Sequence, residues 1–338
     1  MNPLLKPKKL SVGDTVATLS ISGGRAGDPD MIGRYRLGRR RLQEVFGLEV
    51  VETPNALKGN DFIYRNPEAR VEDLHWALSN PLVKGIISNQ GGDDSYRLLS
   101  YVDFDVIRNN PKVFTGFSDI STIHSLFTYA GVTSYYGPCL LTPIAQPGRL
   151  DDYTAHWMRR VLFSTETIGR VEPCHYWTPI TWKDDKAEDI VWTRNTGYQV
   201  LQGTGRVSGR LLGGCSAPMQ QIMGSFLFPK AEQWRDSIIF LEIGSPYNSA
   251  LAGLHLLRSL AATGMYRQAR GLVCQSMTDD EKQTVLKVLR DEERLVDLPI
   301  LVGLDFGHRT PMTMLPIGAM AEIDCEEGTF AILESGVE

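Results

Sequence analysis

Apolar runs alternate with helix-period stretches through the first part of the chain. The runs are rich in β-branched and aromatic residues and end at Gly, Pro or polar residues, which is typical of buried strands. Strands are expected at residues 15–21 and 83–88 and in the run that ends before Ser118. Helices are expected at 30–46, from Asn66-Pro67-Glu68 onward, and at 119–129. Because these units follow one another with short links, they predict a mainly parallel sheet.

The pattern changes after Pro138. Residues 143–202 show weak periodicity and are rich in Pro, Trp, Thr and charge, apart from a predicted helix at 151–163. Beyond them, strands are expected at 237–242, 271–274, 299–304 and 320–333, and helices at 216–224, 249–263 and 279–292. We therefore predict an N-terminal α/β domain (1–142), a linker and loop segment (143–202), and a smaller C-terminal β-rich, β-barrel-like α/β domain (203–338).

Composition narrows the class of protein. The chain has 338 residues, 42% of them hydrophobic and 22% charged, which suits a two-domain globular protein. The net charge of -5 gives no reason to expect nucleic-acid binding. No apolar run approaches the roughly 20 residues that span a bilayer, and the first residues lack the apolar core of a signal peptide. The five cysteines are scattered, which favours reduced thiols in a cytoplasm and no zinc site.

Three predicted strands run into residues that can perform chemistry. They lead to Ser118, Glu242 and His308. Binding and catalytic groups in α/β proteins cluster at the carboxyl ends of strands. A serine hydroxyl needs a base to take its proton, His308 would be that base, and Glu242 would orient the imidazole. The order along the chain therefore indicates a nucleophile, an orienting carboxylate and a general base.

The same pattern suggests donors for an oxyanion. If a strand turns sharply into a helix at Ser118, the backbone N–H of Asp119 points toward the reacting carbonyl. Gly91-Gly92 follows the preceding strand and lets the backbone approach a ligand closely. We assign Asp119 and Gly92 to the oxyanion site and Gly91 to substrate binding.

Each residue also has a structural interpretation. Ser118 could cap the following helix, Glu242 could pair with an arginine, and His308 could be a loop histidine with satisfied hydrogen bonds. The Gly-Phe-Ser-Asp-Ile text is not the Gly-x-Ser-x-Gly elbow. The arginines of the 30–46 helix could form an anion patch, although a solvated helix face is more common.

The sequence resembles the LD-carboxypeptidase family of serine peptidases, and within it the microcin C self-immunity branch. The Asn110-Pro-Lys-Val-Phe-Thr-Gly-Phe-Ser-Asp-Ile120 segment is the most specific match. Other matching segments are Gly91-Gly92 with Arg97–Asp105, Tyr135–Pro138, Gly209–Gly214, Phe240–Glu242, Gly307-His308 and Pro316–Gly318. The resemblance implies a Ser118-Glu242-His308 triad, a flavodoxin-like or glutamine-amidotransferase-like N-terminal domain, no metal or other cofactor, a cytoplasmic location and a homodimer.

Two activities follow from the resemblance. LD-carboxypeptidases release D-alanine from muropeptide tetrapeptides, whereas the self-immunity branch cleaves a peptidyl–nucleotide conjugate. The long middle segment favours the second, with Trp182 stacking on a nucleobase or, alternatively, packing the linker. Arg194 and Tyr247 are further candidates for substrate binding. A non-catalytic protein that binds such conjugates remains the alternative of another class.

The chain departs from the family pattern near the expected pocket. Asp93 replaces an aromatic residue, Cys215 replaces Asn, and Ile243-Gly244 replaces small polar residues. Asp93 and Asp94 would add negative charge there and disfavour an anionic substrate, unless Arg194 or Arg309 offsets it. We include Asp93 among the substrate-binding candidates.

Overall fold

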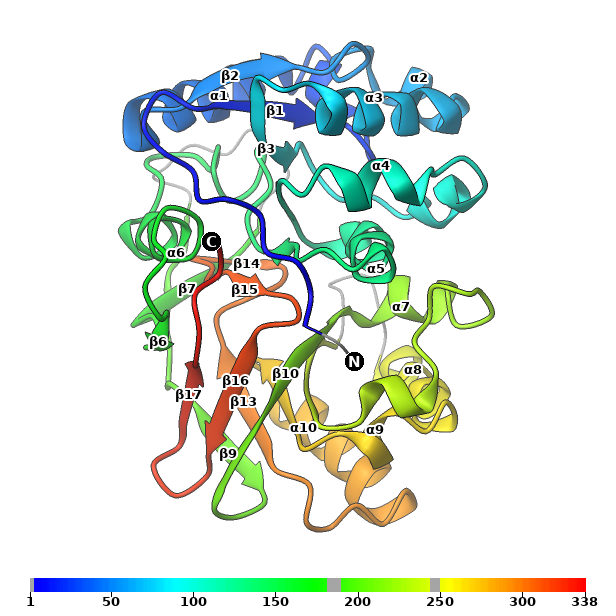
Figure 1. Cartoon of the computed structure of the whole chain (residues 1–338). Coiled ribbons are helices and arrows are strands. Elements are labelled where there is room, and N and C mark those ends of the chain that lie inside the picture. Colours follow the sequence, from blue (N-terminus) through cyan, green and yellow to red (C-terminus); the bar gives the residue numbers. More distant parts are fainter. Residues whose placement is uncertain (1–2, 181–189, 244–249) are drawn as a thin grey trace.

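The N-terminal part forms a six-stranded sheet in the computed structural model, which describes residues 3–180, 190–243 and 250–338 (Figure 1). The strand order is β15-β5-β4-β3-β1-β2, and β1 to β5 are parallel, as predicted. These strands are β1 (Thr15–Leu19), β2 (Glu49–Glu52), β3 (Val83–Ser88), β4 (Val113–Gly116) and β5 (Tyr135–Tyr136). Their buried side chains give the continuous apolar runs seen in the sequence.

Helices connect these strands. They are α1 (Ile32–Phe46), α2 (Asn60–Arg65), α3 (Pro67–Ser79), α4 (Phe104–Asn109) and α5 (Ser121–Ala130). Short 3₁₀ turns lie at η1 (Arg25–Gly27), η2 (Ser95–Ser100) and η3 (Ser118–Ile120). Helix α3 begins at Pro67, as expected, since proline at the first helical position loses no hydrogen bond.

The C-terminal part is built on an eight-stranded mixed sheet of order β6-β17-β16-β10-β11-β12-β13-β9. Its strands are β6 (Gly169–Arg170), β9 (Gln199–Gln202), β10 (Arg206–Cys215), β11 (Ser237–Glu242), β12 (Gly271–Gln275), β13 (Ile300–Leu304), β16 (Met320–Asp324) and β17 (Thr329–Ile332). Strands β10 to β13 are parallel, and the others are antiparallel to their neighbours. The expected β-rich α/β domain is therefore an open sheet, with β6 and β9 at its edges.

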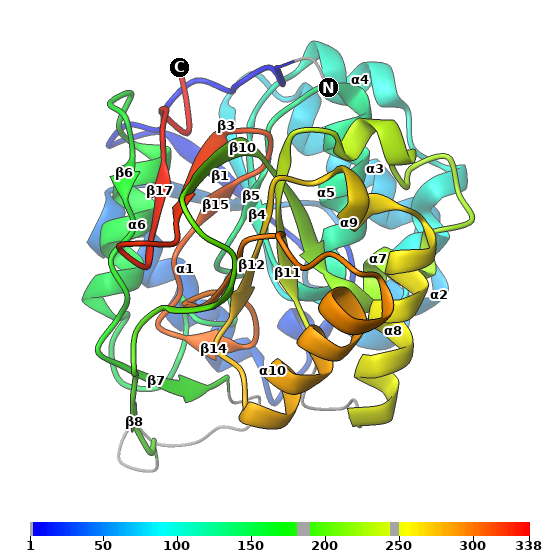
Figure 2. The same cartoon turned by 90° about the horizontal axis from the view of Figure 1, so that it is seen from below.

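The helices of this part are α7 (Ser216–Gln221), α8 (Ala250–Ala262), α9 (Met265–Gln268) and α10 (Asp279–Leu286), with a 3₁₀ turn η5 (Ala231–Trp234) and a π-helical turn η6 (Lys287–Glu292). Seen from below, α8 and α10 lie on one side of the sheet (Figure 2). The predicted 320–333 strand is a hairpin of two strands, because the chain turns at Gly328 with φ +61°.

The middle segment does more than link the two sheets. Besides helix α6 (Asp152–Leu162), it supplies both edge strands of the C-terminal sheet. Its β7 (Tyr176–Pro179) and β8 (Thr193–Arg194) form a small sheet with β14 (Arg309–Thr310). In return, β15 (Leu315–Pro316) joins the N-terminal sheet beside β5. The division at residues 142 and 202 stays a prediction.

Two arginines of α1 correct the interpretation of its surface. Arg34 and Arg41 are buried, so a solvated face is wrong for both. Arg41 donates to the carbonyls of Ile144 (2.8 Å), Gln146 (2.7 Å) and Gly148. The Arg34 Nε donates to a carbonyl of the same loop at 3.2 Å. These two cations therefore fix the loop after residue 143.

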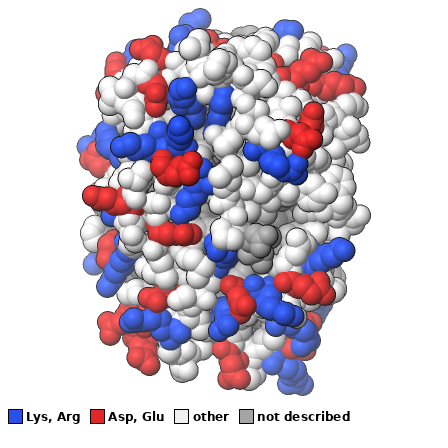
Figure 3. Space-filling model, viewed as in Figure 1, with Lys and Arg blue, Asp and Glu red and all other residues white. Residues whose placement is uncertain are grey.

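Charges are mixed on the outside of the molecule. On the face shown in Figure 3, Lys and Arg are interspersed with Asp and Glu, as the small net charge suggests. Across the described ranges, no helix is long and apolar enough to cross a membrane.

Candidate active site

Ser118 lies at a strained turn between β4 and α5. Its φ is +65°, in the left-handed region that residues with a Cβ rarely adopt. Neither η3 nor α5 has a side-chain cap at its first turn, so the interpretation of Ser118 as a helix cap is wrong. A side-chain hydrogen bond stabilises the turn, since Ser121 Oγ donates to the Ser118 carbonyl at 2.8 Å.

The loop after β3 approaches this turn through its glycines. A Cβ on Gly91 would lie 2.9 Å from the Cβ and 3.2 Å from the Oγ of Ser118. A Cβ on Gly92 would lie 2.3 Å from the Oγ of Ser22. Only glycine at these two positions allows the loop backbone to approach the side chains of Ser118 and Ser22 this closely. The oxyanion role of Gly92 stays a prediction.

The Asp119 side chain has a structural part of its own. Its carboxylate accepts hydrogen bonds from Ser22 Oγ (2.5 Å) and the Ser95 backbone N–H (3.0 Å). Burial raises the pKa of Asp119, and these bonds oppose that rise. The side chain thus ties the Ser118 turn to the loops around Gly92, while the role assigned to Asp119 concerns its backbone N–H alone.

Glu242 and His308 form a buried pair. Glu242 ends β11, and His308 lies in the loop after β13; their side chains are 2% and 12% exposed. Glu242 Oε1 accepts bonds from His308 Nδ1 at 2.5 Å and from the His308 backbone N–H at 2.9 Å. Gly307, with φ +86°, permits this, since a Cβ there would lie 2.4 Å from Glu242 Cδ. The Glu242–arginine pairing considered from the sequence is wrong.

This pairing sets the protonation of the imidazole. Burial alone would lower the pKa of His308, but the charge and hydrogen bond of Glu242 outweigh it, so the pKa lies above its ordinary value. Burial likewise opposes ionisation of Glu242, yet His308 and Tyr136 hold the pKa of that carboxyl below its ordinary value. Since a carboxylate only accepts, Nδ1 carries the proton and Nε2 of the neutral ring is free to accept one.

Two aromatic residues join Ser118 to this pair, and the sequence analysis assigned no role to either. The Tyr136 hydroxyl donates to Glu242 Oε2 and accepts from the Ser118 backbone N–H at 3.3 Å. The Phe117 ring lies 5.3 Å from the His308 ring, edge to face. The structure therefore brings the three predicted residues into one connected cluster. The only sequence signal was that Tyr136 lies in a family-like segment.

We expected both Asp93 and Asp94 to add negative charge near Ser118, and this expectation is wrong for Asp94. Asp94 is buried and accepts from Arg70 through both oxygens, at 2.8 and 3.0 Å, and from Arg97 at 2.6 Å. Burial opposes its ionisation, but the two arginines lower the pKa of Asp94 and neutralise its charge. Asp93 is exposed, and its carbonyl accepts from Gln221 at 3.3 Å.

Cys215 lies beneath the Ser118 turn. Its backbone N–H donates to Ser121 Oγ at 2.8 Å. The thiol is buried, and burial followed by the charge of Glu242 raises its pKa well above the ordinary value. Cys215 therefore places a buried, neutral thiol beneath this turn.

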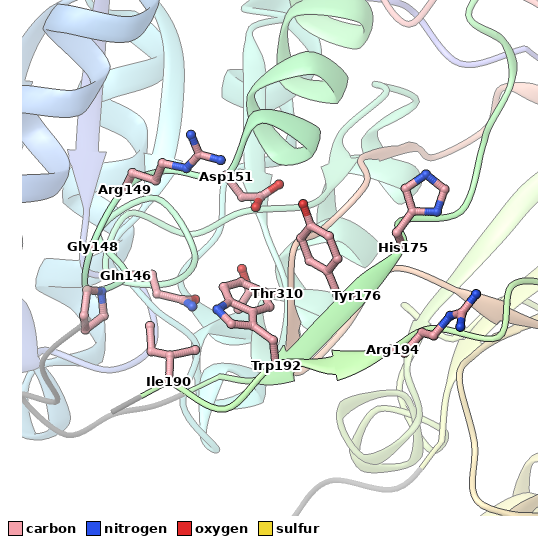
Figure 4. Close-up of a pocket in the computed structure, with 11 residues that line it drawn as sticks. Gln146, Gly148, Arg149, Asp151, His175, Tyr176, Ile190, Trp192, Arg194 and Thr310 are labelled. Atoms are coloured by element: carbon pink, nitrogen blue, oxygen red, sulfur yellow. The ribbon is translucent and has the colours of Figure 1, made fainter. Parts of the chain in front are cut away.

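A cavity of about 740 Å³ lies beside the small sheet of β7, β8 and β14 (Figure 4). It is lined by Gln146, Pro147, Gly148, Arg149, Asp151, His175, Tyr176, Ile190, Trp192, Arg194 and Thr310. Figure 4 shows Arg149 and Arg194 on opposite sides, with the rings of Tyr176 and Trp192 between them. These rings meet edge to face at 5.6 Å and are about half exposed. Arg194 is thus placed where a substrate could reach it, whereas Trp182 and Tyr247 lie outside the described residues.

Arg309 does not supply free positive charge, contrary to one expectation. It is buried, lies 4.3 Å over the Trp177 ring, and is 3.9 Å from Asp305. Its charge is therefore directed at Asp305, and the Trp177 ring packs against its guanidinium group. Within the described part of the chain, no three His, Cys, Asp or Glu residues are grouped to hold a metal ion.

Comparisons with known proteins identify the family and relatives with the same fold. Family models of the LD-carboxypeptidase N-terminal and C-terminal domains match residues 16–137 and 208–323. The microcin C7 self-immunity protein MccF of Escherichia coli is 27% identical over 347 residues, covering 98% of this chain and 96% of that protein. A probable murein peptide carboxypeptidase of Bacillus subtilis is 27% identical over 343 residues, covering 98% and 95%. A crystal structure of an MccF-like protein from Streptococcus pneumoniae in complex with AMP is 29% identical, with a TM-score of 0.86 over 95% of this chain and 98% of that one.

Proposed function

Because the chain belongs to the LD-carboxypeptidase family, we propose that it is a serine-type hydrolase that cleaves an amide at or near the C-terminus of a peptide. The observation that carries this proposal is the Glu242–His308 pair, a buried carboxylate bonded to Nδ1 at 2.5 Å. His308 packs on Phe117, next to the strained turn of Ser118. An oriented imidazole beside the turn that carries the hydroxyl supports the assignment of His308 as the base for a serine nucleophile.

The proposed reaction has two stages, in which Ser118 is the nucleophile and His308 transfers the protons. Ser118 Oγ attacks the carbonyl carbon of the scissile amide, and His308 Nε2 takes the hydroxyl proton. Backbone N–H groups of Gly92 and Asp119 stabilise the oxyanion. The C–N bond then breaks, and His308 gives its proton to the leaving amine. Water, deprotonated by the same nitrogen, hydrolyses the acyl-enzyme and releases the peptide acid, while Glu242 stabilises the imidazolium.

We propose a peptidyl–nucleotide conjugate as the substrate. His308 protonates the leaving group, and β14, which directly follows it, carries Thr310 of the cavity wall. We therefore propose that the leaving group lies on the side of the cavity. A volume of about 740 Å³ is that of a site for a whole ligand and far exceeds what D-alanine fills. Arginines beside exposed aromatic rings suit a base with an anionic group, and a relative at 29% identity was solved in complex with AMP.

The second candidate is release of D-alanine from muropeptide tetrapeptides. It is favoured by the murein peptide carboxypeptidase of Bacillus subtilis, which is as similar to this chain, at 27% identity, as the self-immunity protein. The exposed Asp93 also adds negative charge near Ser118, which disfavours a phosphate placed there.

One assay separates these activities. The purified protein is given an aspartyl-adenylate analogue joined by a stable amide and, in parallel, a muropeptide tetrapeptide, and products are followed by mass spectrometry. We expect cleavage of the nucleotide conjugate. Release of D-alanine alone would reassign the protein to cell-wall recycling. If neither is cut but both bind, the protein is a binding protein and the proposal is wrong.

We also propose that the protein works as a homodimer in the cytoplasm. All five cysteines are unpaired, which suits a reducing compartment. Light scattering at assay concentration tests the dimer, and a monomer mass would contradict it.

A further inference from the structure

Asp305 is a buried carboxylate that the proposed chemistry does not use. It follows β13, lies just before His308 in the chain, and is fully buried. Its Oδ2 accepts from the Cys174 backbone N–H at 2.7 Å, and its Oδ1 accepts from Asn195 Nδ2 at 3.0 Å. The Tyr153 hydroxyl of α6 lies 3.3 Å from Oδ2. One side chain thus bonds to residues more than a hundred positions away along the chain.

The two donors flank the strand pair that carries part of the cavity wall. Cys174 lies two residues before β7, and Asn195 directly follows β8. At this end of the pair, Tyr176 lies opposite Arg194. His175, Tyr176, Trp192 and Arg194 all line the cavity. Asp305 therefore joins the β7 side and the β8 side at one end of the strand pair, which carries Tyr176, Trp192 and Arg194 of this wall.

The other end of β7 is fastened to His308 itself. The Ile180 backbone N–H donates to the His308 carbonyl at 3.3 Å. Strand β14 pairs with β7, with Thr310 opposite Thr178. The wall is thus held to the histidine loop at two places, by a main-chain bond at one end and by the Asp305 carboxylate at the other.

Burying this carboxylate has a cost that its partners offset only in part. Burial raises the pKa of Asp305 to about 6. The hydrogen bond from the Cys174 N–H, the charge of Arg309 and the hydrogen bonds from Tyr153 and Asn195 each lower this pKa, but they do not outweigh burial. Arg309 is 3.9 Å away, longer than a hydrogen bond. The carboxylate accepts three hydrogen bonds from three different segments, so its two oxygens join α6, Cys174 before β7 and Asn195 after β8 at one point.

We propose that Asp305 is a positioning residue that fixes the β7–β8 wall of the cavity relative to His308, and so makes cleavage efficient for substrates whose leaving group fills the cavity. This inference rests on the proposed function. A substrate with a small leaving group does not need the wall, so its cleavage depends on the catalytic residues and the oxyanion donors but not on Asp305. Asp305 is therefore a determinant of leaving-group specificity.

The test is Asp305→Asn, assayed on two substrates with the same acyl part, one with a nucleotide and one with a small amine as leaving group. An asparagine presents two N–H donors to Asn195 or Cys174, so at least one hydrogen bond to a charged acceptor is lost. We expect kcat/KM to fall about tenfold or more for the nucleotide conjugate, chiefly through KM, and by less than about threefold for the small one. Equal losses on both substrates, or no loss, would overturn the proposal.

Two further variants sharpen this test. Asp297→Asn changes an exposed carboxylate before the same strand and should leave both rates unchanged. In the double variant Asp305→Asn/Asn195→Asp, the amide at position 305 donates to the carboxylate at position 195, which reverses the wild-type hydrogen bond. This variant should restore at least part of the preference for the nucleotide conjugate. Failure of the double variant to restore any preference, at an unchanged melting temperature, would also overturn the proposal.

A measurement without substrate separates this inference from the proposed function. In hydrogen–deuterium exchange, Asp305→Asn should accelerate exchange in peptides covering 174–180 and 190–198, compared with Asp297→Asn. If the wild-type protein cleaves neither substrate, the proposed function fails, yet faster exchange still supports the link from Asp305 to the wall. Unchanged exchange would contradict that link whatever the activity.

Discussion

The residues proposed for chemistry and the cavity proposed for recognition are built differently. Glu242 ends a buried strand of one of the two large sheets, and Ser118 and His308 each follow such a strand. The cavity wall consists of short strands and loops, and individual buried side chains such as Arg41 and Asp305 hold it in place. Continuous strand pairing fixes the first region, whereas single side-chain bonds fix the second. Substitutions in the first should slow every substrate, and those in the second should discriminate between substrates.

The largest effect is expected from Ser118→Ala. Removing the nucleophile should lower kcat by about 10³- to 10⁶-fold on both the nucleotide conjugate and the muropeptide, because no other group forms the acyl-enzyme. The melting temperature should hardly change, since the side chain is small and the turn is held by Ser121. Steady-state kinetics and a thermal melt measure the two. A loss of kcat on only one of the two substrates would contradict the expectation that substitutions at the catalytic residues slow every substrate.

Glu242→Gln should lower kcat by roughly 10³- to 10⁴-fold, because the wrong tautomer of His308 is favoured. It should also move the acid limb of the kcat/KM profile to lower pH. Glu242 raises the pKa of His308 against burial, so without its charge the imidazole loses its proton at lower pH. The exposed Glu326→Gln is the control. An acid limb that stays in place or moves to higher pH would contradict the account.

Glu242 also predicts a dependence of stability on pH. The raised pKa of folded His308 adds stability that is fully present below its unfolded pKa of about 6.5 and is lost as pH rises through the folded pKa. His308→Gln should therefore reduce the fall of the melting temperature that the wild type shows as pH rises above about 6.5. A profile identical to the wild type would show that other groups control stability there.

Tyr136→Phe should lower kcat by roughly 10- to 100-fold on both substrates with little change in KM. It removes a hydrogen bond to charged Glu242, which is worth about 1.5–3 kcal/mol. Tyr135→Phe is a matched control, because this buried hydroxyl donates to the Gly336 carbonyl instead, at 2.8 Å. Similar kcat losses in both variants would indicate a general packing defect.

Arg194→Ala should have the smallest effect and the most selective one. It should raise KM for the nucleotide conjugate by about three- to tenfold and leave muropeptide hydrolysis unchanged, since an exposed cation contributes little. Rising ionic strength should weaken the effect through screening. Equal changes on both substrates would remove the distinction between the two regions.

The same contrast explains how much the sequence could predict. Strands such as Val83–Ser88 and Ser237–Glu242 were predicted residue for residue, because burial on both faces leaves continuous apolar runs. The pairing of Asp94 with Arg70 could not be predicted, since it depends on a contact across 24 positions. The same holds for the Tyr136–Glu242 bond across 106 positions. Long-range partners of single polar residues leave no periodicity in a sequence.

The most direct test of the central claim is covalent labelling of the native protein with a serine-directed phosphonate, read by intact mass and peptide mapping. The account predicts one adduct, located on Ser118, formed much more slowly in Glu242→Gln and absent from Ser118→Ala. A protein that hydrolyses its substrate while Ser118 stays unlabelled, or that carries the adduct on another residue, would contradict the assignment of Ser118, Glu242 and His308 as the catalytic residues.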